Sequence, residues 1–151
     1  MIPRFRFRLQ QVLDVRARRE DLARQDLAHA MMAVAAQQER VVSADADMER
    51  ALAALRDLMG GAVELETLRS AHDALSLARS RSRHERAMLS SLGEVADERR
   101  ADLVRASQQR EVLTQLRVRA LERHRVDERR DEAIQMDELA TRRTARARAA
   151  A

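Results

Sequence analysis

Residues Leu13 to Leu55 decide the fold of this chain, because apolar side chains recur there at every seventh position. The repeating row comprises Leu13, Glu20, Leu27, Val34, Val41, Met48 and Leu55. A second, offset row is mainly small and apolar and comprises Leu9, Arg16, Ala23, Ala30, Gln37, Ala44, Ala51 and Leu58. Two such rows are typical of a coiled-coil seam. The Ala residues allow close approach of a second helix, and the polar exceptions tend to set the register at some cost in stability.

The composition agrees with a protein made of long helices. Of the 151 residues, 36% are charged and 1% are aromatic, and there are only three Gly and one Pro. So few aromatic rings and helix breakers argue against a mixed globular core. Disorder is the alternative for such a charged chain, but the sustained seven-residue repeat argues against it. We therefore predict an all-α protein.

Several function classes lack the residues that they need. Cys is absent, which excludes disulfides and thiol chemistry. Histidines occur at positions 29, 72, 84 and 124, without the close spacing of a metal site, and there is no Gly-rich phosphate loop. We predict no catalytic residue, no cofactor, no metal and no enzymatic activity. No apolar run approaches the roughly 18 residues of a membrane span, so we also predict no direct membrane insertion.

The positive charge is concentrated at the two ends of the chain. All 29 basic residues are Arg; residues 1–19 hold six of them with one Asp, and residues 141–151 hold four with no acid. With a total charge of +4, the residues between these ends carry a net −5. Arg side chains can bind phosphates, but only Phe5 and Phe7 are available to stack on bases. We predict no nucleic-acid partner.

The helix-breaking glycines divide the chain into two long helical segments. We predict a long antiparallel two-helix coiled-coil hairpin over residues 1–140, with a first helix from about 5 to 59 that ends at Gly60-Gly61. We expect a turn and a short helix over about 60–80, a second long helix over about 83–140, and a flexible basic tail over 141–151. A parallel dimer of one long helix is the rival arrangement.

Two registers of the hairpin are possible. A turn at Gly60-Gly61 alone would put Leu9 beside about Val112 and leave nearly thirty C-terminal residues overhanging. A separate distal structure over residues 62–82 would instead bring both chain ends together, and we favour it because Ser residues thin the apolar stripe there. The ends would then form one apolar tip ringed by Arg, made of Arg4, Phe5, Arg6, Phe7, Arg8, Leu9, Leu13, Ile134, Met136, Leu139, Arg142 and Arg143.

Both ends of the sequence carry motifs. The motif near the N-terminus is Phe5-x-Phe7-x-Leu9-x-x-Val12-Leu13-x-x-Arg16. The motifs in the C-terminal part are Leu113-x-x-Leu116, then Glu128-Arg129-Arg130-Asp131-Glu132, and then Asp137-Glu138-Leu139-Ala140-x-Arg142-Arg143. In this order, around a long heptad interior, they resemble the FliJ family of the flagellar type III export apparatus. The resemblance covers nearly the whole chain, and its specific parts are the two ends.

The resemblance implies a cytoplasmic coiled coil that acts as the stalk of a hexameric export ATPase. The terminal tip would insert into the ATPase ring, and the middle would contact the export-gate membrane protein at the cytoplasmic face of the inner membrane. It also implies binding of export chaperones.

In the family, the gate contact resembles aromatic-x3-Leu-x2-small-x3-His. Leu77, Ser80 and His84 fit this spacing, while Asp73 stands in the aromatic place. The alternative is that Leu77 packs under the turn.

A second function remains open at this point. The chain would then be a general coiled-coil scaffold or chaperone-like adaptor, including a stalk protein of a virulence type III secretion system. The paired basic ends favour a stalk, because a general scaffold has no need to bring its termini together.

Overall fold

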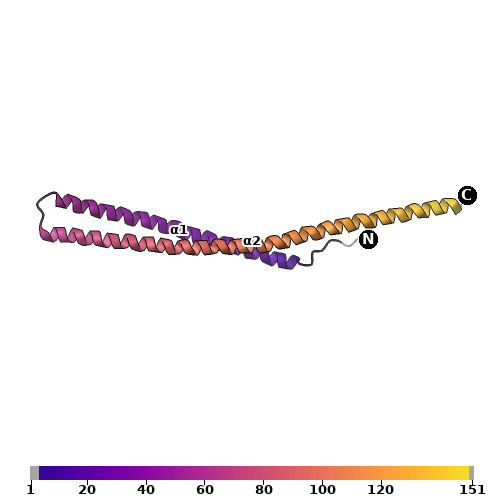
Figure 1. Cartoon of the computed structure of the whole chain (residues 1–151), viewed down its shortest axis with the longest axis horizontal. Coiled ribbons are helices and arrows are strands. Elements are labelled where there is room, and N and C mark those ends of the chain that lie inside the picture. Colours follow the sequence, from indigo (N-terminus) through magenta and orange to yellow (C-terminus); the bar gives the residue numbers. More distant parts are fainter. Residues whose placement is uncertain (1–3, 150–151) are drawn as a thin grey trace. The chain divides into compact units, whose positions relative to one another are not determined.

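The protein consists of two long α-helices joined by a short turn (Figure 1). The computed structural model describes residues 4–149. Helix α1 spans Gln10–Met59 and contains 50 residues, and α2 spans Leu65–Ala149 and contains 85. The two helices pack against each other, and the described range contains no strand. The prediction of an all-α helical hairpin is confirmed.

The contacts divide the chain into two units. The first unit combines the described residues up to Glu20 with those from Ala106 onward. The second unit spans Asp21–Arg105 and contains the turn. Each unit pairs a stretch of α1, or the segment before it, with a stretch of α2. The prediction of one hairpin domain followed by a separate tail stays a prediction.

The turn lies where the paired glycines predicted it. Helix α1 ends at Met59, and the Gly60 amide donates to the Asp57 carbonyl at 3.3 Å. Arg56 lies in the last turn of α1, where a cation interacts favourably with the helix dipole. Five residues, 60–64, separate the end of α1 from the start of α2.

The heptad rows of α1 face α2 as the sequence predicted. Val41 and Ala44 are buried, with 6% and 1% of their surface exposed. The other members of both rows are buried or half-buried, except Leu9 at the start of the row. The period of the apolar pattern therefore identified the packed face of α1 correctly.

The predicted short helix over about 60–80, and a separate start of the second long helix at about 83, are wrong. Helix α2 begins at Leu65 and continues through this region without interruption. Its seam keeps the seven-residue spacing through Leu75, Ser82, Leu89 and Ala96, all buried or half-buried. The helix does not break at the serines because Ser82, 4% exposed, donates a hydrogen bond to Asp45 of α1. A polar seam residue with a partner is compatible with a continuous coiled coil.

The favoured register is wrong as well. Phe5 contacts His124, and Arg16 bonds to Gln109, so the N-terminal segment pairs with α2 well before its end. Because α2 meets Phe5 at His124 and runs on to Ala149, its last residues continue beyond this contact. The hairpin with a turn at the glycines alone, which leaves an overhang, describes the pairing better.

Two helix boundaries also differ from the predictions. Helix α1 starts at Gln10 rather than near Phe5. Residues 141–149, predicted as a flexible tail, are helical up to Ala149. Ala and Arg are both strong helix formers, and Arg at the C-terminal end complements the helix dipole, so this stretch can extend α2 without a packing partner.

Candidate functional site

The described residues contain neither a metal cluster nor a membrane span. Within residues 4–149, no group of three or more His, Asp or Glu side chains is placed to hold a metal ion. Neither α1 nor the described part of α2 has a stretch long and apolar enough to cross a membrane. The candidate sites lie on the surfaces of the two helices and in layers of polar residues between them.

A buried amide forms the first polar layer of the seam. Gln37, 4% exposed, donates from Nε2 to the backbone carbonyl of Glu85 at 3.0 Å and to its carboxylate at 2.5 Å. Gln37 is one of the two polar exceptions in the second heptad row. Its partners lie at one position of α2 only, so this layer favours one register over its neighbours.

A second polar layer surrounds Asp45. Its carboxylate accepts a hydrogen bond from the Ser82 hydroxyl at 2.5 Å and another from the Arg86 guanidinium at 2.7 Å. The Ser82 bond, followed by the Arg86 interactions, holds the pKa of Asp45 below its ordinary value of 3.8. Asp47 nearby forms an ion pair with Arg81 at 3.7 Å. Three residues of α2 thus hold one short stretch of α1.

The first unit contains its own polar layer. Arg110 Nε lies 2.6 Å from Glu20 Oε2, and the Glu20 side chain is only 7% exposed. One turn earlier in α1, Arg16 donates to the Gln109 amide oxygen at 2.5 Å. The two charged residues that interrupt the apolar rows of α1 therefore both have partners on α2.

The N-terminal residues of the predicted tip lie against α2. The Phe5 ring packs edge-on against His124, with centroids 5.5 Å apart and planes 81° apart. Phe7 is half-buried, and Leu13 is buried in the seam. The exposed arginines are Arg4, Arg6 and Arg8; the last two line a surface depression with Phe5, Phe7, Gln10, Gln11 and Arg117.

The C-terminal residues of the predicted tip lie farther along α2. Ile134, Met136 and Leu139 are 49%, 67% and 53% exposed. Ile134 and Arg142 line a second surface depression, and Arg143 is exposed. Ile134 follows His124 by ten residues, roughly 15 Å along the helix. The expectation of one joint apolar tip is therefore wrong: the two sets occupy successive positions along α2.

The predicted gate residues share one exposed face. Leu77 is 73% exposed, and Ser80 and His84 are exposed as well. Their spacing of three and four residues puts them on one side of α2, together with Asp73. The alternative that Leu77 packs under the turn is contradicted by this exposure.

Sequence reasoning missed two surfaces of α2. One is a depression with the apolar residues Leu116 and Val126 on its wall. The other is a basic groove beside Met48, which contains Arg79, Arg83 and Arg86. The sequence could have indicated this groove, because its arginines recur at spacings of four and three residues and so lie on one face of a helix.

A helical hairpin with polar layers in its seam and with exposed, charged outer faces is the architecture of a coiled-coil protein. The model of the family described as flagellar FliJ protein matches residues 5–149. The chain belongs to the FliJ family, whose members are structural components of the flagellar export apparatus. Comparison with curated proteins and with solved structures gave no significant match.

Proposed function

We propose that this chain is the stalk of the hexameric export ATPase and couples the ATPase ring to the export gate. In this role it is a cytoplasmic protein held at the inner membrane by its partners. The flagellar family assignment supports this role over that of a virulence secretion stalk or a general scaffold. The proposal assigns separate surfaces of the hairpin to the ring and to the gate.

The observation that carries the proposal is the overhang of α2. From Arg129 to Arg146 every described side chain is exposed, and this stretch continues beyond the position where Phe5 packs on His124. Its exposed apolar residues are Ile134, Met136 and Leu139, and two arginines follow them. Clustered exposed apolar side chains are common at protein interfaces. A single helix of this kind is also narrow, at about 10–12 Å with side chains, which suits insertion into a ring.

The N-terminal arginines form the second part of the ring contact. Phe5 and Phe7 lie against α2, whereas Arg4, Arg6 and Arg8 are exposed. Positive charge at this end favours encounter with an acidic ring by electrostatic steering, which salt weakens. The apolar overhang would supply affinity, and the arginines would supply speed of association.

Binding of the purified export ATPase to immobilised protein tests the ring contact. The variant Ile134→Ser with Met136→Ser and Leu139→Ser should lose binding by at least about tenfold, the equivalent of 1.4 kcal/mol. The control Met31→Ser with Met32→Ser and Val42→Ser removes similar exposed apolar groups from α1 and should bind normally. Equal binding by both triple variants would contradict insertion of the overhang.

The contribution of the arginines is tested by measuring how ATPase binding depends on salt concentration. Deletion of residues 141–151 together with Arg4→Gln, Arg6→Gln and Arg8→Gln should lower ATPase binding and flatten its dependence on salt, while helicity changes little. Binding that keeps its full salt dependence would show that these charges lie outside the contact.

The exposed face of Leu77, Ser80 and His84 is the proposed gate contact. Leu77 exposes most of its surface, so it is available to a partner without any change in the hairpin. Replacing Leu77 and His84 with Ala should weaken binding of the cytoplasmic domain of the gate protein and leave ATPase binding intact. Loss of both interactions would point to a general defect. Export chaperones are a further proposed class of partner, to be assayed with the same variants.

A further inference from the structure

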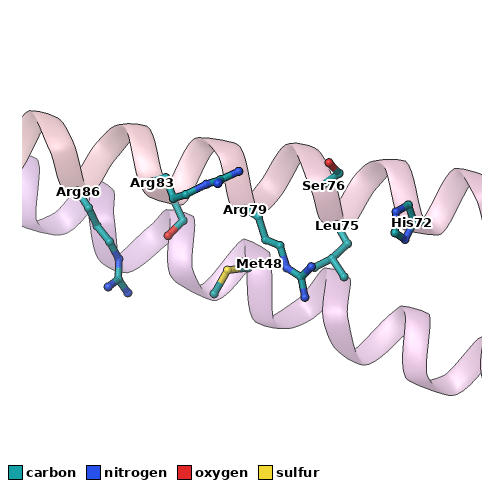
Figure 2. Close-up of a pocket in the computed structure, with 8 residues that line it drawn as sticks. Met48, His72, Leu75, Ser76, Arg79, Arg83 and Arg86 are labelled. Carbon is teal, nitrogen blue, oxygen red and sulfur yellow. The ribbon is translucent and has the colours of Figure 1, made fainter.

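We propose that the groove between α1 and α2 at Met48 and Leu75 binds an acidic helical segment of a partner protein. The residues that line it are Met48, His72, Leu75, Ser76, Arg79, Ser82, Arg83 and Arg86. Figure 2 shows Arg79 and Arg86 reaching from α2 toward α1, with Met48 of α1 between them. This surface is separate from the overhang and from the Leu77 face, and the proposal does not depend on the stalk role.

The charges in this groove are unbalanced. Several arginines elsewhere on the helices have an Asp three residues away, as in Arg24 with Asp21 and Arg100 with Asp97. Near the groove, the carboxylates of Asp45 and Asp47 pair with Arg86 and Arg81. Among the described residues, Arg79 and Arg83 have no acidic partner. Two guanidinium groups therefore remain uncompensated.

The spacing makes these charges repel one another. Arg79 and Arg83 are four residues apart, and Arg83 and Arg86 are three apart. Like charges at these spacings lie on one helix face and destabilise the helix. Residues 74–84 contain three Arg and no acid. Carboxylates of a partner would relieve this repulsion, so the groove favours an acidic ligand.

The floor of the groove favours a protein ligand. Met48 is half-buried and leaves a short apolar strip accessible beside the cations, whereas Leu75, at 2% exposed, is covered within the seam. An amphipathic helix can place apolar side chains on this strip and carboxylates, one turn or about 5.4 Å apart, beside the arginines. His72 lies about two turns before Arg79 on the same side of α2.

The α1 side of the groove disfavours flat or continuous polyanions. Asp45 and Asp47 of α1 lie outside its lining, paired with Arg86 and Arg81, and their negative charge opposes the close approach of an anionic bilayer or a phosphate backbone. Residues 21–105 also contain no Phe, Tyr or Trp on which a base could stack. A protein helix can instead direct its carboxylates toward α2 alone.

Binding of a labelled helical peptide to the full-length protein tests the proposal. The probe is about 20 residues long, some 30 Å as a helix, with Glu on one face and Leu beside it; the matched peptide carries Gln in place of Glu. We expect binding of the Glu peptide only, weakened about two- to fivefold by Arg79→Gln or by Arg83→Gln. Arg40→Gln is the control, because Arg40 is exposed on α1 and does not line the groove.

Three results would overturn the proposal. The first is no binding of the Glu peptide, and the second is equal weakening by Arg40→Gln, which would indicate general charge attraction. The third is tighter binding of phosphatidylglycerol vesicles or of a single-stranded oligonucleotide with the same dependence on Arg79 and Arg83. Circular dichroism of each variant checks that the helices are intact.

Discussion

The amide of Gln37 on α1 bonds both to the backbone carbonyl of Glu85 on α2 and to its carboxylate. This side chain is 4% exposed and belongs to a heptad row that is mainly small and apolar. A polar group buried in such a seam costs free energy unless it finds a partner. Glu85 therefore satisfies the buried amide of Gln37, and this pairing favours one register of α1 on α2.

The first prediction concerns this layer. Gln37→Ala should lower the free energy of unfolding by about 1–2 kcal/mol, because the Glu85 carboxylate loses its partner in a half-buried site. Urea unfolding followed by circular dichroism measures the change. Gln38→Ala is the matched control, since Gln38 is exposed and its loss should change stability by less than about 0.5 kcal/mol.

The second prediction tests the heptad seam with neighbouring residues. Val41→Asp should destabilise the hairpin by roughly 2–5 kcal/mol, because Val41 is 6% exposed and the carboxylate would be buried. Leu27→Asp, at a half-buried seam position, should also destabilise the hairpin. Val42→Asp should have little effect, since Val42 is 60% exposed. Equal melting temperatures for Val41→Asp and Val42→Asp would refute the assigned seam.

The third prediction concerns the ion pair of Glu20 and Arg110. Arg110→Leu should cost about 2–3 kcal/mol, because it removes the guanidinium from a carboxylate that is 7% exposed. Changing Glu20→Leu in the same chain should restore much of this loss, since an apolar pair can replace a buried ion pair at little cost. A double-mutant cycle from chemical unfolding measures the coupling. Additive single effects would mean that the pair contributes nothing specific.

The fourth prediction is a dependence of stability on pH. The folded pKa of Asp45 lies below 3.8, mainly because the Ser82 hydroxyl donates to the carboxylate and secondly because of Arg86. The stabilisation is therefore present above about pH 4 and is lost as the pH falls through the folded pKa. NMR titration should show the Asp45 pKa rising toward 3.8 in Ser82→Ala. An unchanged pKa in this variant would exclude the hydroxyl as the main cause.

The fifth prediction separates surface from core on α2. Leu75→Ala should cost about 2–4 kcal/mol, because Leu75 is 2% exposed. Leu77→Ala should leave the melting temperature nearly unchanged, because Leu77 is 73% exposed. Thermal unfolding of the two variants in parallel makes the comparison. A large loss for Leu77→Ala would remove it as a clean probe of the gate contact.

The sequence alone identified the fold class, the turn and the packed face of α1. These features follow from local or periodic patterns: paired glycines end a helix, and a seven-residue repeat places its members on one side. Leu13, Val41 and Ala44 were assigned to the seam on this basis and are buried. The gate residues Leu77, Ser80 and His84 came from the family resemblance, and their spacing of three and four residues puts them on one exposed face of α2.

The register, and with it the position of the candidate sites, was decided only in the tertiary structure. The serines near residue 82 suggested a break, because a sequence pattern does not reveal that Ser82 has Asp45 opposite it. Because α2 is uninterrupted from Leu65, Phe5 lies beside His124. Ile134 follows farther along the same helix. Heptad repeats are degenerate under shifts of seven residues, and the position of the turn together with the pairing of polar side chains across the two helices removes that degeneracy.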